Sequence, residues 1–212
     1  MEIQADGVSV DGPRGPLLRP TSLRLRDGER VLVAGEPGAG HTALALCLAG
    51  QLRPGTGEVR LDGSADPAEL RRRIAVVDAP QVSEPDDGLS FATVVGEELA
   101  FAGMPADRRA VAAWIAGRGL QEYAREHVEH VPADIRTAVL ADIAAARPGV
   151  RALILDTPDR HAGDPDGWWR LAGSLAERGF AVAVLCTTSS ARVLGEPAVL
   201  LGEPAAVPGV PR

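Results

Sequence analysis

The chain has 212 residues, of which 45% are apolar, and this is enough to bury a hydrophobic core of its own. A net charge of -7 argues against a nucleic-acid partner, because such a partner selects for a basic face. No apolar stretch approaches the roughly 20 residues that cross a bilayer, and the first residues lack the pattern of a signal peptide. We therefore expect a cytoplasmic protein with no direct membrane insertion.

The first half of the chain alternates between strand and helix patterns. Apolar runs predict strands at Leu23–Leu25 and Arg30–Ala34, and periodic apolar positions predict a helix at Thr42–Gln51. From about residue 88 to 147 the sequence contains mostly helix-forming residues with periodic apolar positions. This stretch is predicted to be a helical insert.

The second half predicts a parallel β-α-β unit. Arg151–Leu155 and Phe180–Cys186 are apolar throughout, as expected of central strands covered on both faces, and Gly167–Arg178 between them has helical spacing. The sequence therefore predicts an α/β fold with a largely parallel sheet, formed by a single domain at 1–202. The remaining segment, 203–212, is rich in Pro, Gly and Ala and is predicted to be a flexible tail.

A glycine-rich turn joins the strand at Arg30–Ala34 to the helix that follows it. Backbone N–H groups of such a turn can close around phosphate oxygens, and the helix N-terminus adds a partial positive charge. The pattern is G-x-x-x-x-G-[K]-[ST], with His41 at the lysine position and Thr42 at the magnesium-binding hydroxyl. The predicted phosphate-binding residues are Gly35, Gly38, Ala39, Gly40, His41, Thr42 and Ala43.

The segment DGERVLVAGEPGAGHTALALCLAGQLRPGTGEVRLDG resembles ATP-binding cassette (ABC) proteins almost position for position, and the resemblance covers roughly residues 8 to 190. It implies a P-loop NTPase fold of the ABC ATPase type, with antiparallel strands near the N-terminus. It also implies ATP with Mg²⁺ as cofactor. The implied partners are a second ABC-type subunit and a membrane protein contacted through the helical insert, which would hold the chain at the inner face of the plasma membrane.

The loop departs from the family's pattern at its lysine. In the family this lysine binds the β- and γ-phosphates, whereas His41 is shorter and ordinarily neutral at pH 7. Losing one charge-assisted hydrogen bond costs about 1.5 to 3 kcal/mol, or roughly ten- to a hundred-fold in affinity. All 22 basic residues are arginine, a bias typical of a GC-rich bacterium, so no lysine can replace the missing one. We expect ATP binding to be weak or absent.

The catalytic positions depart as well. Asp156 matches the family's magnesium-binding carboxylate, which with Thr42 makes the implied metal site. The glutamate that activates water is replaced by Thr157, and losing a general base costs a factor of about 100 to 10,000. Thr188 stands where a switch histidine is expected, and residues 131–135, VPADI, replace the signature LSGGQ. We therefore expect little or no ATP hydrolysis by the chain itself.

Two further positions of the family's nucleotide site differ in this sequence. The glutamine that couples the nucleotide site to the membrane subunit would align with Ala79, and the sequence leaves open whether Gln81 takes its place. The aromatic residue that stacks on adenine has no counterpart, since only Val8 and Val10 stand in that region.

His127 and His130 have the i, i+3 spacing of a helical metal site and lie beside Glu126 and Glu129. The simpler interpretation is a solvated helix face.

Two functions fit these features. One is a degenerate nucleotide-binding subunit that assembles with a second subunit and a membrane protein. The other is a pseudo-ATPase scaffold or regulator that does not bind nucleotide. An active ATPase with rewired residues lacks a visible replacement for the base and the cation. A groove in the insert near Ser90–Gly103 would favour the membrane partner over the scaffold.

Overall fold

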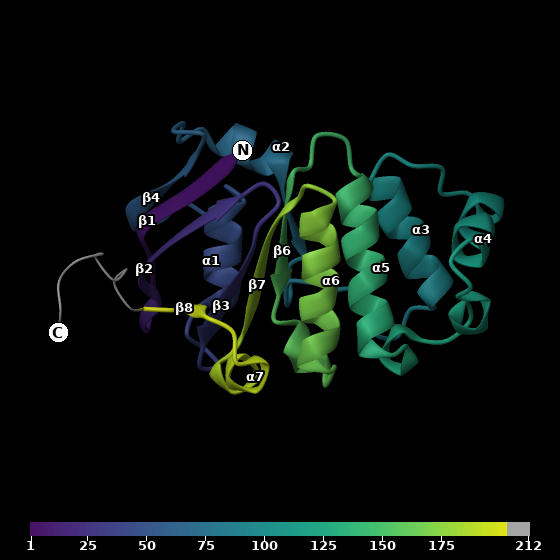
Figure 1. Ribbon diagram of the computed structural model, residues 1–212. Coiled ribbons are helices and arrows are strands. Elements are labelled where there is room, and N and C mark those ends of the chain that lie inside the picture. The colour runs from purple at the N-terminus through teal and green to yellow at the C-terminus, as the bar shows by residue number, and fades with distance from the viewer. Residues whose placement is uncertain (203–212) are drawn as a thin grey trace.

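The computed structural model describes residues 1–202 and contains two sheets (Figure 1). A small antiparallel sheet has the order β2-β1-β4, and a parallel sheet has the order β5-β6-β7-β3-β8. Their strands are β1 (Glu2–Gly12), β2 (Gly15–Arg26), β3 (Arg30–Gly35), β4 (Thr56–Leu61), β5 (Ile74–Val77), β6 (Ala152–Asp156), β7 (Ala181–Thr187) and β8 (Ala198–Leu200). The predicted α/β fold with N-terminal antiparallel strands is confirmed. The predicted tail at 203–212 lies outside the described residues.

The strand sequences explain the difference between the two sheets. Every residue of β6 is buried, because the parallel sheet is covered on both faces. In β2, exposed Arg24 alternates with buried Leu23 and Leu25, as in a sheet with one solvated face. The strand predicted at Leu23–Leu25 is only the end of β2. Its earlier part contains Pro16 and Pro20, which the sheet tolerates because β2 is an edge strand.

Helices fill the space on both sides of the parallel sheet. Helix α1 packs between the two sheets, whereas α5 and α6 lie side by side on the opposite face (Figure 1). The predicted helix at Thr42–Gln51 ends earlier, since Gly50 has a φ of 65° that stops the helix. The helices outside the insert are α1 (His41–Leu48), α2 (Pro67–Arg73), η3 (Pro158–His161), α6 (Pro165–Glu177) and α7 (Thr188–Leu194).

The helices between β5 and β6 surround a core of their own. Val95, Leu99, Ile115 and Ile143 are among the side chains buried in it. Ser90 accepts a hydrogen bond from the Thr93 N–H at the start of α3. Within residues 1–202, no helix is both long and apolar enough to cross a membrane. The elements of the insert are α3 (Phe91–Phe101), α4 (Arg108–Ala116), η1 (Gln121–Tyr123), η2 (Val128–His130) and α5 (Ala133–Ala146).

A buried carboxylate joins the insert to the parallel sheet. Asp78, which directly follows β5, is 5% exposed. Its Oδ1 lies 2.9 Å from Nη2 of Arg136 on α5 and 3.0 Å from Nη2 of Arg160 on η3. His161 places its Nε2 3.1 Å from Oδ2 of the same carboxylate. Three elements that are distant in sequence therefore meet at one negative charge.

The partners of Asp78 determine its ionisation. Burial alone would raise its pKa, but the close contact with His161, the hydrogen bonds from Arg136 and the charges of Arg136 and Arg160 outweigh burial, so the pKa lies below the ordinary value. A folded-state pKa below the unfolded one stabilises the protein at pH values above about 4. This contribution is lost as the pH falls through the folded-state pKa.

We predict that Arg136→Met lowers the free energy of unfolding by about 3 kcal/mol, because it leaves the buried Asp78 charge with fewer partners. Chemical denaturation measures this change. Arg72→Met is the matched control, since the Arg72 side chain is 68% exposed, and should change stability by less than about 0.5 kcal/mol. Equal effects of the two substitutions would contradict a structural role for the buried pair.

Candidate functional site

The phosphate loop follows β3 and leads into α1. Gly38 and Gly40 have φ angles of 85° and 103°, and the Ala39 N–H donates to the Glu36 carbonyl at 2.9 Å. A Cβ at Gly40 would lie 2.3 Å from the Leu17 carbonyl oxygen, so only glycine fits there. In the described part of the chain, no side chain caps the N-terminus of α1. Its first N–H groups therefore remain available to an anion.

His41 is the first residue of α1 and is 7% exposed. Its Nε2 lies 2.8 Å from the backbone carbonyl oxygen of Cys186, on β7. When Nε2 of a neutral imidazole donates to a carbonyl, Nδ1 is an acceptor and cannot donate to a phosphate oxygen. The ring still lines the cavity beside the loop, but its donor is engaged by the backbone.

Thr42 and Asp156 come together although 114 residues separate them. The Thr42 hydroxyl donates to Oδ2 of Asp156 at 2.6 Å, and Asp156 is 1% exposed. Burial raises the pKa of Asp156, although the Thr42 hydrogen bond and the positive charges nearby partly oppose this. Its Oδ1 is buried and has no hydrogen-bond partner among residues 1–202. An unpartnered carboxylate oxygen next to a hydroxyl suits a hard cation such as Mg²⁺, which prefers oxygen ligands.

A cavity of about 860 Å³ lies beside the loop, within the size range of small-molecule sites. The phosphate loop, the Pro80 turn, η3 and the start of α7 form its walls. Of the residues predicted from sequence to bind nucleotide, the ones that line this cavity are Gly38, Gly40, His41, Thr42 and Ala43.

Three predicted residues lie elsewhere. Ala39 lines a neighbouring cavity, and Gly35 closes β3. Gln81 is exposed, with its N–H donating to Glu84, and Pro80 occupies the cavity wall in its place. Gln81 is thus absent from the cavity lining, because the turn after Ala79 points its side chain to solvent.

Thr157 and Thr188, which stand where the resemblance implies a glutamate and a histidine, differ in their contacts. Thr157 lines the cavity and has a φ of 50°, whereas Thr188 is absent from the cavity lining and its hydroxyl donates to the Glu36 carboxylate. A threonine hydroxyl is itself a poor general base near neutral pH.

Asp159 and Arg160 also line the cavity, and the sequence analysis did not single them out. Oδ2 of Asp159 accepts hydrogen bonds from the Thr187 hydroxyl and the Ser190 hydroxyl, both at 2.7 Å. Nη1 of Arg160 donates to the Asp156 carbonyl at 2.8 Å. Their position in the sequence could have identified them, since they directly follow Asp156-Thr157-Pro158. Residues that follow a central parallel strand lie at the edge of the sheet where ligands bind.

The residues near the expected adenine position are apolar. Val8 and Val10 are 0% and 6% exposed and belong to the core, so they do not face a ligand. Leu17 instead is 51% exposed and lines the cavity from β2. In the segment at 131–135, Pro132 caps α5 without a side-chain hydrogen bond.

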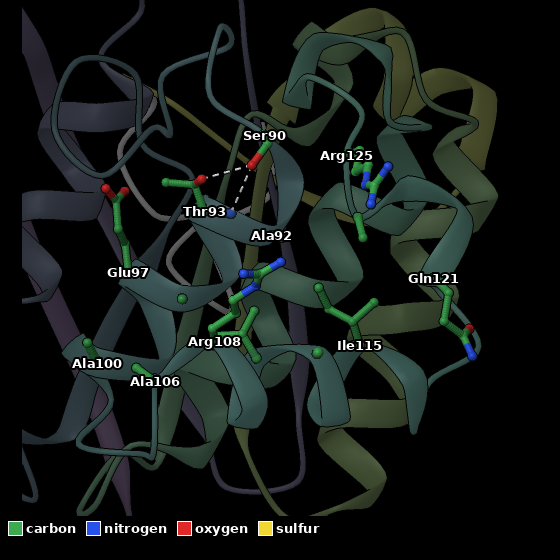
Figure 2. A pocket seen from close by; sticks show the side chains of 14 residues that line it. Ser90, Ala92, Thr93, Glu97, Ala100, Ala106, Arg108, Ile115, Gln121 and Arg125 are labelled. Atoms are coloured by element: carbon green, nitrogen blue, oxygen red, sulfur yellow. Dashed lines mark hydrogen bonds between the residues drawn. The ribbon is translucent and has the colours of Figure 1, made fainter.

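A second hollow, of about 930 Å³, lies on the insert between α3 and α4 (Figure 2). Its lining is mostly apolar and includes Gly96, Ala100 and Val111. Glu97, Arg108 and Arg125 place charged groups around it. This surface, hereafter the insert groove, overlaps the segment Ser90–Gly103 in which a docking groove was expected and extends beyond it to α4 and η1.

Comparison with known proteins agrees with this geometry. The family model described as ABC transporter matches residues 18–146, which is more than half of the chain. The energy-coupling factor transporter ATP-binding protein EcfA of Methanothermobacter thermautotrophicus is 31% identical over 199 residues, covering 86% of this chain and 61% of that protein. The ABC transporter ATP-binding protein RamB of Streptomyces coelicolor is 28% identical and covers 99% of this chain.

The chain is shorter than these relatives, spanning 61% of the first and 35% of the second. A solved structure of the ATP-binding subunit of an ABC transporter superposes with a TM-score of 0.67 at 18% identity, covering 97% of this chain and 89% of that one. Sequence and fold lead to the same conclusion: the chain belongs to the ABC transporter family and has the fold of its ATP-binding domain.

Proposed function

We propose that this chain is a degenerate ATP-binding subunit that binds Mg²⁺-nucleotide weakly and hydrolyses ATP slowly or not at all. Its role is assembly with, or regulation of, a second ABC-type subunit and a membrane protein at the inner face of the plasma membrane. One observation supports the proposal most directly. The glycine-rich turn and the Thr42–Asp156 hydrogen bond are present, whereas His41 donates to the backbone carbonyl of Cys186.

Two parts of the site support the proposal that nucleotide still binds: the backbone N–H groups of the loop and the residues that would hold a metal ion. The uncapped start of α1 presents N–H groups, and Thr42 and Asp156 would hold Mg²⁺. When bound, Mg²⁺ would neutralise part of the phosphate charge. The loss of hydrolysis is supported by Thr157, which cannot serve as a general base near neutral pH.

A membrane partner is supported by the insert groove. The relatives are ATP-binding proteins of transporters by their names. An apolar groove between two helices suits an amphipathic helix, and the charges of Glu97, Arg108 and Arg125 would select opposite charges on it. A scaffold that binds no nucleotide would not require this groove.

We predict that His41→Lys tightens binding of a fluorescent ATP analogue with Mg²⁺ by roughly ten- to a hundred-fold, because it restores one charge-assisted hydrogen bond. His130→Lys adds the same charge on the exposed η2 turn and should leave the affinity unchanged. Wild-type protein assayed alone should show no Mg²⁺-dependent turnover. Absence of binding by both wild type and His41→Lys would favour the scaffold, and turnover of about 1 per second or faster would overturn the assignment of Thr157.

We predict that Asp156→Asn raises the thermal midpoint of the nucleotide-free protein. Its raised folded-state pKa means that the ionised carboxylate costs stability above the unfolded-state pKa, and the neutral amide removes that cost. The advantage should shrink as the pH falls to about 4, where the unfolded aspartate also takes up a proton. The same variant should lose the Mg²⁺ dependence of nucleotide binding, whereas Glu122→Gln, at an exposed position, should change neither property.

We predict that Ala112→Arg in the insert groove lowers binding to inverted membrane vesicles from the native cells by about tenfold, because a bulky charge fills an apolar surface. Ala113→Arg is the matched control, since Ala113 is exposed on the same helix but outside the groove. Co-sedimentation measures the bound fraction, with protein-free lipid vesicles as the reference. Equal loss in both variants, or equal binding to lipid alone, would argue against a protein partner in the groove.

A further inference from the structure

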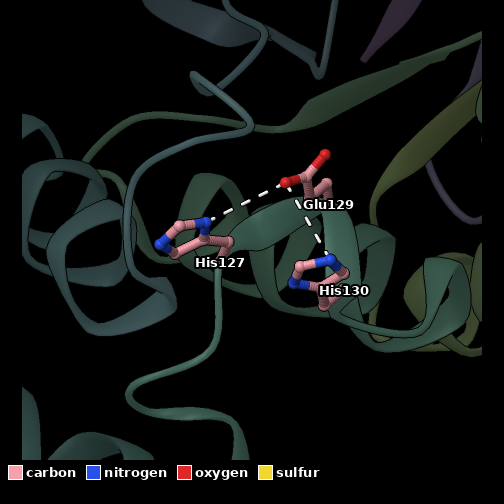
Figure 3. Close-up of side chains that lie close together, drawn as sticks. All are labelled: His127, Glu129 and His130. Carbon is pink, nitrogen blue, oxygen red and sulfur yellow. Dashed lines mark ion pairs between the residues drawn. The ribbon is translucent and has the colours of Figure 1, made fainter.

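Three side chains outside the nucleotide cavity have the composition of a transition-metal site. His127, Glu129 and His130 each offer one ligand atom, and these atoms all lie within 4.8 Å of one another (Figure 3). Two imidazoles and one carboxylate form a common set of protein ligands for Zn²⁺, with the fourth position left to water. All three side chains are more than half exposed, so an ion can reach them from solvent.

The turn that carries these residues explains why they converge. They lie on the 3₁₀ turn η2 and its N-cap, where positions i and i+3 eclipse each other. The two imidazole rings are consequently stacked, with centroids 6.0 Å apart and an angle of 14° between their planes. Nδ1 of His127 and Nε2 of His130 are both 3.9 Å from Oε1 of Glu129.

The backbone of the turn is fixed by the rest of the insert. Val128 is 2% exposed, and its N–H donates to the Leu89 carbonyl at 3.0 Å. The Glu129 N–H donates to the Asp87 carbonyl at 3.3 Å. The backbone therefore fixes the positions of the three Cβ atoms, so less conformational entropy is lost when the side chains bind an ion. A solvated helix face, the simpler interpretation of the sequence, would not require this convergence.

We propose that His127, Glu129 and His130 bind one divalent transition-metal ion, with Zn²⁺ as the expected occupant. Donor atoms around a tetrahedral Zn²⁺ ion lie roughly 3.3 Å apart, so the 3.9 Å separations close through small side-chain rotations. Two nitrogen ligands favour Zn²⁺ over Mg²⁺, which prefers oxygen. The site is therefore distinct in its chemistry from the Thr42–Asp156 pair, and it does not depend on nucleotide binding.

Isothermal titration of the untagged protein with ZnCl₂, in the presence of excess MgCl₂, tests the proposal. We expect one equivalent of Zn²⁺ to bind and His127→Gln and His130→Gln each to weaken binding by at least about tenfold. Glu126→Gln removes a neighbouring exposed carboxylate that is not part of the cluster and should leave the affinity unchanged. His41 and His161 remain in every variant, so they cannot account for the loss.

Titration with Co²⁺ gives a second readout, because the visible absorption of the bound ion reports its coordination. The wild-type spectrum should be that of a site with nitrogen ligands and low coordination number, and it should disappear in His130→Gln while the far-ultraviolet circular dichroism stays constant. Stoichiometric binding that survives both histidine substitutions, or no stoichiometric binding by the wild type, would overturn the proposal.

Discussion

Parallel pairing of β6, β7 and β3 is the constraint on which the nucleotide site depends. The register pairs Gly35 with Thr187 and Asp156 with Leu185, so the carboxyl ends of three strands meet at one edge of the sheet. The segments that follow these strands therefore lie at that edge. They are the phosphate loop after β3, the Thr157 segment after β6 and the start of α7 after β7. The Thr42–Asp156 hydrogen bond follows from this arrangement, as expected of a crevice at the carboxyl ends of parallel strands.

The features that follow from local sequence patterns could be predicted. The apolar runs of β6 and β7 and the glycine-rich turn after β3 specify the parallel core and the loop, because periodicity and turn chemistry are local properties. The direction of the His41 ring could not be predicted, since its partner Cys186 lies 145 residues away. Arg160 was missed for the same reason: its contact with Asp78 depends on tertiary structure.

The charges around the cavity are unfavourable for a bare triphosphate. Asp159 lines the cavity, Asp156 is buried beside Thr42, and the guanidinium of Arg160 is already shared with Asp78 and Glu84. A lysine in the loop would offset the negative charge of these aspartates. Position 41 is instead a histidine, whose Nε2 donates to the Cys186 carbonyl. Under the proposed function, phosphate would therefore be neutralised by backbone N–H groups and by a bound cation.

The carboxylate of Asp78 also joins the insert to the segment that follows β6. Arg136 belongs to the insert and Arg160 to the segment after β6, yet both bind the same Oδ1 atom. A rotation of the insert against the parallel sheet would have to break one of these pairs in a buried environment, where an unpaired charge is costly. Insert and sheet are thereby joined through α5, Asp78 and η3, and η3 lies at the wall of the cavity beside the phosphate loop.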